Sequence, residues 1–473
     1  MTSTHTTAER PLATSLVEEL TTALADGVVI ADPDVLDAYA HDYAPICPHG
    51  TAAALVRARS TTDVAATVRI AARHGAAVVP QGARTGLAGA ANAVDGCVLL
   101  SMERMTEILE IDATDMTATV QPGVLNLQLS RAVGEHGLFY PPDPSSWEWS
   151  TLGGNVATNA GGLCCVKYGV TADYVRALEV VLADGRVVRT GRRTAKGVAG
   201  YDLTHLFVGS EGTLGVITEI TVSLVPAGAA PLTAVAFFPD EAEACETVTE
   251  YLATGTVPSM LELMDRTSIR LVQADRDLGF PDDVGAMLLV QSDRGGELAV
   301  ADLQLFASLA EARGADVMVA EDEAEAGLLL EARRHLAIAI EKYSAFLSED
   351  VCVPRSRLVE LLAGVEAIRQ RHGLEMTCAG HVGDGNMHPT VLFDPSDPGQ
   401  VERARLAFDD VMRLGLDCGG TITGEHGVGI MKAEWLEREL GEVALELHHR
   451  VKDALDPHGV FNPGKVLPHR TRT

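Results

Sequence analysis

Residues Pro141 to Gly169 read PPDPSSWEWSTLGGNVATNAGGLCCVKYG and form the longest glycine-rich connection that we single out in the chain. Two Gly-Gly pairs within it let the backbone approach a ligand closely, because glycine has no side chain to keep a ligand away. The side chains of Thr151, Thr158 and Asn159 offer hydrogen bonds beside that backbone. Long connections of this kind are usually functional, so we interpret the stretch as part of a binding site rather than as a plain linker.

Two further glycine-rich stretches flank it in the chain. Gln81 to Gly89 (QGARTGLAG) follows a predicted strand at 77–80, where exposed backbone N–H groups can cradle a pyrophosphate. Gly200 to Glu219 combines a polar cluster with a predicted strand at 214–225. The first of these lacks the GxGxxG spacing, and no GxxxxGKS/T occurs, so neither an ordinary doubly wound dinucleotide fold nor a P-loop is predicted. A tight turn remains the alternative for the first stretch taken alone.

A different group of residues carries possible chemistry in the second half of the chain. His381 and His388 lie in HVGDGNMH, and residues 424–427 read GEHG. One helix would separate the two histidines by about 10 Å, and one extended strand would point them to opposite faces. A loop that folds back at its glycines brings them together. Glu425 then adds an oxygen ligand, and such a site keeps open positions for a substrate.

His426 follows the third ligand in the chain and is free to act as a base. Zinc fits the mixed nitrogen and oxygen ligand set, and manganese or iron(II) remain alternatives. The simpler interpretation is a glycine-rich surface loop with incidental histidines. Because the two motifs occur together, we favour a metal site formed by His381, His388 and Glu425.

The overall composition restricts the possible classes of function. The 473 residues suffice for two or three domains, and the hydrophobic content of 47% indicates a globular chain. The net charge of −29 argues against nucleic acid or an anionic membrane surface as a partner. Met1 to Arg10 has no apolar core of signal-peptide length, no run approaches the roughly 18 residues of a membrane span, and the cysteines form no CxxC pair. We therefore expect a soluble, cytoplasmic protein with reduced thiols, peripheral to a membrane at most.

The pattern of apolar residues predicts an α+β chain in two halves. Asp184-Gly185 marks a hairpin at 178–190 in the first half, and a composition break at 226–232 separates the halves. Two strand–helix–strand units in the second half predict a sheet with helices on one face. Strands are predicted at 54–58, 77–80, 234–238, 260–264, 286–291 and 316–320, and helices at 15–25, 60–73, 241–253, 298–310, 321–343 and 401–416.

Three motifs in this order, PPDPSS, NAGG and GSEGTLGVIT, resemble the FAD-binding domain of the vanillyl-alcohol-oxidase/p-cresol-methylhydroxylase (PCMH) flavoprotein family. HxGDGNxH and GEHG are similar to its D-2-hydroxyacid dehydrogenase branch, which includes D-lactate dehydrogenase, the glycolate oxidase flavin subunit and D-2-hydroxyglutarate dehydrogenase. The resemblance covers residues 50–467. It implies an N-terminal lead at 1–46, a two-subdomain PCMH-type FAD-binding domain at 47–227, a ferredoxin-like α+β cap domain with the substrate and metal site at 228–440, and a C-terminal return to the FAD domain at 441–473.

The resemblance also implies which residues hold the FAD. Residues 81–86 would contact its pyrophosphate, and other residues its flavin ring or its adenosine side. The loop at 80–90 contains no histidine, so the covalent link of some relatives is not expected and the FAD is predicted to be non-covalent. The implied cofactor-binding residues are Gln81, Gly82, Ala83, Arg84, Thr85, Gly86, Pro142, Asp143, Thr151, Gly154, Thr158, Asn159, Tyr168, Gly169, Glu211, Gly212, Ile217 and Asn462.

Arg333 lies beside Arg334 on the predicted helix at 321–343. Either arginine can be a solvated partner of a nearby acid, whereas a buried one would clamp a substrate carboxylate through two hydrogen bonds. The resemblance favours Arg333, because the D-lactate branch carries a similar Ala-Arg and a DVCVP segment, here at 350–354. The D-2-hydroxyglutarate branch has a lysine at about the place of Ser348, which argues against a second carboxylate in the substrate.

The predicted activity is the oxidation of a small D-2-hydroxy acid, D-lactate or a glycolate-like acid, to the 2-oxo acid, with hydride transfer to FAD. The metal would bind the substrate, His426 would remove the hydroxyl proton, Arg333 would pin the carboxylate, and Asn386 would orient the hydroxyl region. The electron acceptor stays open between a protein, a quinone and oxygen, and a homodimer is possible. The alternatives are a D-2-hydroxyglutarate-type dehydrogenase, the flavin subunit of a multi-subunit electron-transfer complex, and a flavin-free metallohydrolase.

Overall fold

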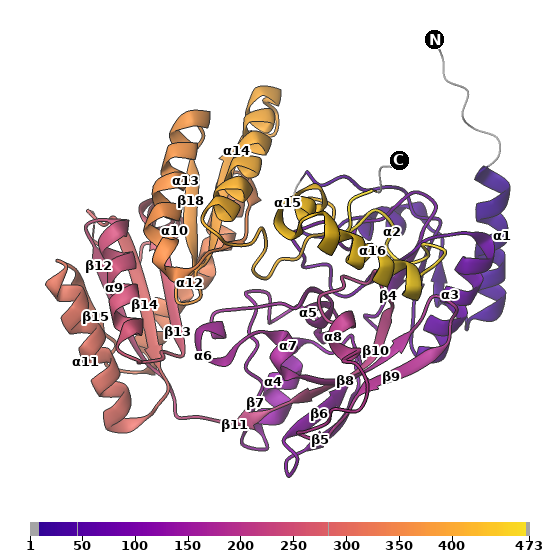
Figure 1. The fold of residues 1–473 in the computed structure, drawn as a ribbon, viewed down its shortest axis with the longest axis horizontal. Helices are drawn as coiled ribbons and strands as arrows, with labels where there is room; N and C mark the ends of the chain where they lie inside the picture. Colours follow the sequence, from indigo (N-terminus) through magenta and orange to yellow (C-terminus); the bar gives the residue numbers. More distant parts are fainter. Residues whose placement is uncertain (1–8, 45, 282, 470–473) are drawn as a thin grey trace.

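The computed structural model describes residues 9–44, 46–281 and 283–469. Figure 1 shows the first half of the chain as one body, in indigo to magenta, with a second body beside it. The second body extends from β12 (Leu232–Phe238) to α14 (Pro398–Asp417), and the yellow C-terminal segment lies back on the first body. Residues 1–8, on which most of the signal-peptide prediction rests, lie outside the described residues.

A four-stranded sheet forms the first part of the first body. Its elements are α1 (Glu9–Ala23), β1 (Val29–Ile30), α2 (Pro33–Ala38), β2 (Ala54–Arg57), α3 (Thr61–His74), β3 (Val78–Gln81) and β4 (Val98–Ser101). The strand order is β1-β2-β4-β3, and the last three strands are parallel. Helix α3 begins where the Ser60 side chain accepts a hydrogen bond from the Asp63 amide, and it ends at Gly75, whose φ is 64°. The predicted helix at 60–73 is thereby confirmed.

A five-stranded antiparallel sheet forms the rest of the first body. Its strands are β5 (Ile108–Asp112), β6 (Thr117–Val120), β8 (Val175–Val181), β9 (Val187–Gly191) and β10 (Val216–Ser223), in the order β5-β6-β10-β8-β9. The hairpin predicted at 178–190 is confirmed, and Gly185 makes its turn with a φ of 76°. The connecting elements are α4 (Asn126–Gly134), β7 (Leu138–Phe139), α5 (Leu152–Thr158), α6 (Cys165–Tyr168), α7 (Thr171–Tyr174), α8 (Thr204–Phe207) and β11 (Val225–Pro226).

The second body is built on one large sheet. Its elements after β12 are α9 (Glu241–Ala253), β13 (Met260–Asp265), α10 (Arg266–Asp275), β14 (Ala286–Ser292), α11 (Gly296–Ala312), β15 (Asp316–Val319), α12 (Glu323–Tyr343), β16 (Ala345–Ser348), β17 (Val351–Cys352), α13 (Leu358–His372), β18 (Met376–His381) and β19 (Asn386–Phe393). The order β15-β12-β14-β13 of antiparallel strands, with α9 and α11 as crossovers, is the predicted ferredoxin-like arrangement. Strands β18, β19 and β16 extend that sheet.

The prediction that helices cover one face of this sheet is wrong. Ala234 and Ala236 of β12 pack in a cluster with α9, α11, α13 and α14, whereas Val235 and Phe237 pack in another with α10 and α12. Successive strand residues point to opposite faces. Because both sets of β12 side chains are apolar and buried, each face needs its own layer of helices.

The C-terminal segment returns to the first body. It contains a 3₁₀ turn (Ala433–Trp435), α15 (Leu436–Leu440) and α16 (Glu442–Leu455). Phe461 forms a parallel bridge with Val78, so the tail extends the edge of the first sheet beside β3. Its contacts with the first body begin earlier than residue 441, because the Ile430 amide already donates to the Ala88 carbonyl at 2.8 Å.

Within the described ranges, no helix is long and apolar enough to span a membrane. All eight cysteines lie in these ranges and are free thiols, including the neighbours Cys164 and Cys165.

Candidate functional site

A β-hairpin brings His381 and His388 together. His381 ends β18 and His388 lies in β19, and the turn between them uses Gly385 at a φ of 80°. His388 pairs directly with Ala379, which is two residues before His381 and therefore on the same face of the sheet. The two imidazoles are consequently diagonal neighbours, with ring centroids 5.2 Å apart. The fold-back predicted from the glycines is confirmed, in the form of a hairpin.

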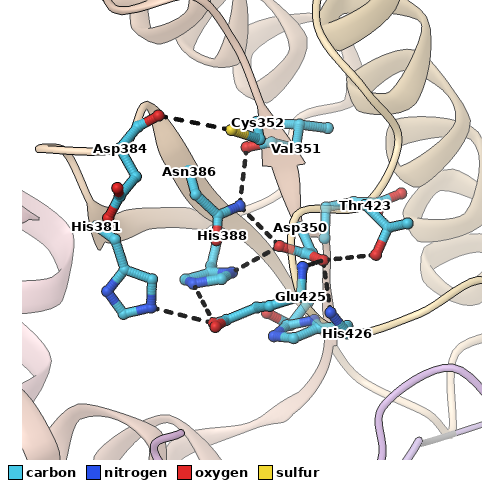
Figure 2. Close-up of polar contacts among 12 residues, drawn as sticks. Asp350, Val351, Cys352, His381, Asp384, Asn386, His388, Thr423, Glu425 and His426 are labelled. Carbon is cyan, nitrogen blue, oxygen red and sulfur yellow. Dashed lines mark hydrogen bonds and ion pairs between the residues drawn. The ribbon is translucent and has the colours of Figure 1, made fainter. Parts of the chain in front are cut away.

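Glu425 reaches both histidines from the segment that follows α14. Its Oε1 lies 3.1 Å from His381 Nε2 and 3.4 Å from His388 Nε2. Figure 2 shows the carboxylate between the two rings, and one ligand atom from each of the three residues lies within 4.8 Å of the others. Two imidazole nitrogens and one carboxylate oxygen form a donor set that suits zinc, manganese or iron(II) and leaves room for further ligands.

The ring of His426 stacks on the ring of His388. Their centroids are 4.9 Å apart, and the planes differ by 9°. His426 Nδ1 is buried and has no hydrogen-bond partner among the described residues. Desolvation lowers the pKa of His426 to about 4, so its ring is neutral at physiological pH. The predicted base therefore lies directly beside the predicted metal ligands.

A carboxylate that the sequence analysis missed, Glu262 on β13, lies behind His381. Its Oε1 is 2.7 Å from His381 Nδ1, and its Oε2 accepts a hydrogen bond from Arg333 Nε at 2.9 Å. Glu262 and Arg333 are 1% and 8% exposed, so they form a buried ion pair. One atom of the predicted substrate clamp is thus engaged by the protein itself. The available signal was a lone acid within an apolar strand, because a buried carboxylate requires a partner.

Asn386 lies at the start of β19 and is buried. Its amide nitrogen donates to Asp350 Oδ1 at 2.7 Å and to the Val351 carbonyl at 3.3 Å. Figure 2 shows the Asn386 amide directed at Asp350 and Val351. Gly424 packs against the Asn386 side chain so closely that a Cβ at Gly424 would collide with it. Both contacts engage the amide nitrogen with the protein, which gives Asn386 a structural task that sequence reasoning did not anticipate.

The first two glycine-rich stretches converge in the first body. A Cβ on Gly82 would lie 3.5 Å from the Gly154 amide and would collide with Thr151 Oγ1. Thr151 caps α5, because its Oγ1 accepts a hydrogen bond from the Gly154 amide at 3.3 Å. Thr158 Oγ1 donates to the Gly154 carbonyl at 3.1 Å. Gly82 of one stretch therefore lies directly against Thr151 and Gly154 of the other, so the predicted cofactor residues of the two stretches are neighbours.

The other residues of the stretch from Gln81 to Gly89 face the N-terminal segment around Tyr39 and Asp42. Gln81 Nε2 donates to the Tyr39 carbonyl at 2.9 Å and to that of Ala91 at 2.8 Å. Arg84, with a φ of 60°, stacks 3.9 Å above the Tyr39 ring and pairs with Glu103 at 3.2 Å. Ala83 and Thr85 flank Arg84, and a Cβ on Gly86 would lie 3.5 Å from Asp42 Oδ2.

The remaining residues of the long stretch link its parts to one another and to the second body. Asp143 accepts hydrogen bonds from the amide and the thiol of Cys164, and Pro142 accepts one from Asn126. Asn159, in a left-handed conformation at a φ of 53°, accepts one from the Ala172 amide at 2.8 Å. Tyr168, which precedes Gly169, donates to Asp293 in the loop after β14 and so joins the two bodies.

Glu211 makes contacts within the protein that the resemblance does not imply. Its two carboxylate oxygens accept hydrogen bonds from the amides of Val428 and Gly429 at 2.7 and 2.8 Å. Asn462 also turns inward, because its amide nitrogen donates to the carbonyls of Glu211 and Ala90. The side chain of Ile217 is buried in the apolar core of the five-stranded sheet. Gly212 packs on Pro80, 3.1 Å from the position that a Cβ would take.

We expect Glu211→Ala to lower the melting temperature more at pH 5 than at pH 8. Burial raises the pKa of Glu211 to about 7 from its usual 4.5. Protonation therefore stabilises the fold fully below about pH 4.5, and this contribution is lost as the pH rises to about 7. Two buried amides also lose their acceptor, at a cost of about 3 kcal/mol. Differential scanning fluorimetry of both proteins across this range measures the gap.

Glu219→Ala is the matched control, since Glu219 lies nearby on β10 and pairs with the exposed Arg189. Its melting temperature should follow that of the unmodified protein at every pH. A difference in melting temperature between Glu211→Ala and the unmodified protein that stays constant or widens toward pH 8 would contradict the raised pKa of the buried carboxylate.

Comparison with known proteins matches both bodies to described families. Residues 52–191 match "FAD binding domain", and residues 229–466 match "FAD linked oxidases, C-terminal domain". The chain belongs to the FAD-linked oxidases. This FAD-linked oxidase is 40% identical to glycolate oxidase subunit GlcD of Bacillus subtilis over 89% of this chain and 90% of the relative. It is 35% identical to the D-lactate dehydrogenase of Anaerostipes hadrus over 93% and 94%.

Solved structures confirm the predicted fold class. A 4-ethylphenol oxidase from Gulosibacter chungangensis superposes with a TM-score of 0.81 at 22% identity and covers all of both chains. A p-cresol methylhydroxylase superposes with a TM-score of 0.81 at 19% identity, over 97% of this oxidase and 98% of that chain. The α+β fold with a PCMH-type FAD-binding domain is therefore shown. The FAD-binding domain also removes the flavin-free metallohydrolase from the alternatives.

The residues of this FAD-linked oxidase fit a bound FAD. Four buried polar atoms lie on or beside the converging stretches without a hydrogen-bond partner in the described part of the chain: Asp42 Oδ2, Gln81 Oε1, Ser150 Oγ and Asn155 Nδ2. Buried polar groups are almost always paired in folded proteins. A cofactor rich in hydrogen-bond donors and acceptors would satisfy such atoms, and Gln81 was already assigned to it from the sequence.

Proposed function

We propose that this FAD-linked oxidase converts a small D-2-hydroxy acid, D-lactate or a glycolate-like acid, to the 2-oxo acid. The relatives named glycolate oxidase subunit and D-lactate dehydrogenase support this class of substrate. The observation that carries the proposal is the convergence of His381, His388 and Glu425, with His426 stacked beside them. Such a cluster matches the need of an alcohol oxidation for a polarised hydroxyl group and a nearby base.

We propose that the three ligand atoms hold one divalent cation, with zinc as the first candidate. The cation, when bound, supplies a Lewis acid that lowers the pKa of the substrate hydroxyl group. The protein prepares this site by directing Nε2 of both histidines at Glu425 while Nδ1 of each faces a buried carboxylate, Glu262 or Asp350. A carboxylate at Nδ1 favours the tautomer that leaves Nε2 free as a ligand.

Oxidation removes two hydrogens from the substrate, the hydroxyl hydrogen as a proton and the α-hydrogen with its electron pair. FAD, when bound, accepts that hydride. His426 takes the proton in this proposal, since its ring is held parallel to that of His388 and is neutral. A general base must lie within reach of the proton it removes, and the contact between His388 and His426 places the base at the ligand cluster.

An anionic substrate approaches a chain of net charge −29, so it needs local positive charge. Arg333 supplies it in this proposal. Its Nε is committed to Glu262, and the two outer nitrogens of the guanidinium are the atoms that would meet a substrate carboxylate. Arg334, on the next position of α12, stacks over Trp147 of the first body at 5.9 Å and adds charge at the junction.

The substrate of this proposal carries one carboxylate. Ser348, at about the position where the D-2-hydroxyglutarate branch has a lysine, engages Thr390 through its hydroxyl group at 2.9 Å. A serine supplies no charge for a second carboxylate. We therefore rank D-lactate and glycolate above D-2-hydroxyglutarate.

Anaerobic bleaching of the visible flavin band tests the proposal on the isolated, FAD-loaded chain. We expect glycolate or D-lactate to reduce the flavin at least about 100-fold faster than L-lactate, because the wrong hand presents its α-hydrogen away from the acceptor. D-2-Hydroxyglutarate should be slower than D-lactate. Equal rates for both hands of lactate, or bleaching by D-2-hydroxyglutarate alone, would contradict the proposed substrate.

The same experiment addresses a second candidate function, that of a flavin subunit within a larger assembly. The relatives at 40% and 38% identity are named as subunits of glycolate oxidase, which favours an electron acceptor supplied by another chain. Rapid anaerobic bleaching of the isolated chain, followed by no reoxidation of the flavin when oxygen is admitted, supports such a partner. A flavin that no 2-hydroxy acid bleaches would instead indicate an electron relay without its own substrate site.

A further inference from the structure

A buried carboxylate, Asp350, lies behind the proposed ligands and makes more contacts than the one with Nδ1 of His388. It sits between β16 and β17 and is 0% exposed. Its Oδ2 accepts hydrogen bonds from Thr423 Oγ1 at 2.7 Å and from the amides of Glu425 and His426 at 2.8 Å each. Its Oδ1 accepts one from Asn386 at 2.7 Å. Figure 2 shows these contacts meeting at one carboxylate.

Asp350 also faces a ligand ring. Its Oδ1 lies 3.7 Å from His388 Nδ1, beyond hydrogen-bond length but near enough to favour a proton on that nitrogen. The opposite ring nitrogen, Nε2, then keeps its lone pair toward Glu425, 3.4 Å away. One carboxylate thus touches the main chain of Glu425 and His426 and biases the tautomer of His388.

We propose that Asp350 is the positioning residue that assembles the ligand cluster and the base. The proposal rests on the function proposed above and extends it to a residue that touches neither substrate nor cation. Glu425 and His426 lie on a segment without regular secondary structure, between α14 and the C-terminal return. The Thr421–Cys352 bridge anchors the segment before these residues, and Glu211 anchors it after them. The amides of Glu425 and His426 themselves take part in no helix or strand pairing and need another acceptor. Asp350 provides that acceptor from the sheet that carries both histidines.

A second cation is the competing explanation, since Asp350, His388 and His426 also bring ligand atoms within 4.8 Å of one another. The hydrogen bonds of Asp350 argue against it. Oδ2 already accepts three hydrogen bonds and Oδ1 accepts one, so at most one lone-pair site, on Oδ1, is left for a cation. His388 would also have to give both ring nitrogens to cations, which requires loss of its last ring proton. Asp350 is therefore an organiser of the site rather than a ligand.

Glu262 shows the same arrangement on the other histidine. Its carboxylate lies 2.7 Å from His381 Nδ1 and is itself held by Arg333. Each proposed ligand ring is thus backed by a buried carboxylate, as is usual for histidines that bind metals. Asp350 differs because it also fixes the segment that brings Glu425 and His426 from the far side of the site.

Asp350→Asn tests the proposal in two ways. Both oxygens of Asp350 accept hydrogen bonds, so the amide group of the variant must turn a donor toward another donor. In FAD-loaded protein treated with a chelator, we expect hydrogen exchange in residues 423–427 to become at least about tenfold faster. With Zn²⁺ or Mn²⁺ added back in competition with a graded chelator, the affinity for one cation should fall about 10- to 100-fold.

Asp302→Asn is the matched control, because Asp302 is a buried acid of the same body that accepts hydrogen bonds from Ser292 and Arg294, away from the site. It should leave exchange at 423–427 and cation affinity unchanged. If Asp350→Asn does not fold, Thr423→Val removes one of the four hydrogen bonds, and both readouts should move in the same direction by about fivefold.

Unchanged exchange at 423–427 in a folded, FAD-loaded Asp350→Asn protein overturns the proposal. So does a stoichiometry of two cations in the unmodified chain that falls to one in the variant, since Asp350 would then be a ligand. The exchange comparison is made without metal. If the unmodified chain binds no cation at all, the proposed function loses its metal, while the role of Asp350 is still decided.

Discussion

In the His381→Ala variant, turnover of 2-hydroxy acid is expected to fall about 10³-fold or more while FAD stays bound. His381 supplies one of the three ligand atoms, and a Lewis acid contributes several kcal/mol to the stabilisation of developing charge. The variant also leaves the buried carboxylate of Glu262 without the ring it faces. Steady-state rates, FAD content and metal content are measured on the same preparation.

His372→Ala is the control for the loss of a histidine as such. His372 ends α13 in the same body and contacts Asp410 at 2.9 Å, away from the ligand cluster. It should retain full activity and metal. Full activity in His381→Ala, or activity that survives exhaustive chelation of the unmodified protein, would contradict the proposed metal site.

The His426→Ala variant should reduce its flavin about 10²- to 10⁴-fold more slowly, which is the usual contribution of a general base. Its metal content should stay unchanged, because His426 stacks on a ligand ring without offering one of the three ligand atoms. Rapid mixing of substrate with the oxidised variant under anaerobic conditions isolates this step from reoxidation. Normal flavin reduction in this variant would remove His426 as the base.

The metal content separates the two predictions. His381→Ala loses the cation and the rate together, whereas His426→Ala loses the rate alone. A His426→Ala protein that also loses its metal would show that the stacked ring supports the ligand cluster structurally, and the proton would then need another acceptor.

The sequence was sufficient to predict that the chain folds back between His381 and His388 and that Glu425 lies beside both rings. Two histidines separated by a glycine-rich turn have few ways to meet, and the hairpin is one of them. Glu425 was recognisable because it lies next to His426 in a short motif. The FAD-binding domain was recognised from the order of its glycine-rich stretches, and the family match of residues 52–191 bears this domain out.

The residues behind the site could not be predicted from the sequence. Glu262 lies in an apolar strand, and its meaning depends on β18 lying beside β13, a pairing between segments that are far apart in the chain. Asp350 belongs to a segment that we had noted only for its resemblance. Its four hydrogen-bond partners come from β19 and from residues 423–426. No local sequence pattern predicts that these separate segments meet at one carboxylate.

Glu211 shows how a resemblance can locate a residue without revealing every contact of its side chain. The GSEGTLG motif does lie beside the other cofactor stretches, because the Glu211 amide donates to Ala157 of α5 at 2.8 Å. The Glu211 carboxylate accepts hydrogen bonds from the amides of Val428 and Gly429, which follow Glu425 and His426 in the chain. Only the three-dimensional path of the C-terminal return reveals that contact.

We propose above that His381, His388 and Glu425 hold one cation in the FAD-loaded protein. Anomalous X-ray diffraction from crystals of that protein, collected on both sides of the metal absorption edge, tests it most directly. We expect one anomalous peak per chain, about 2.0 to 2.2 Å from Nε2 of both histidines and from a carboxylate oxygen of Glu425. No peak in fully metal-loaded crystals, or a peak bound by Asp350 and His426 instead, would contradict it.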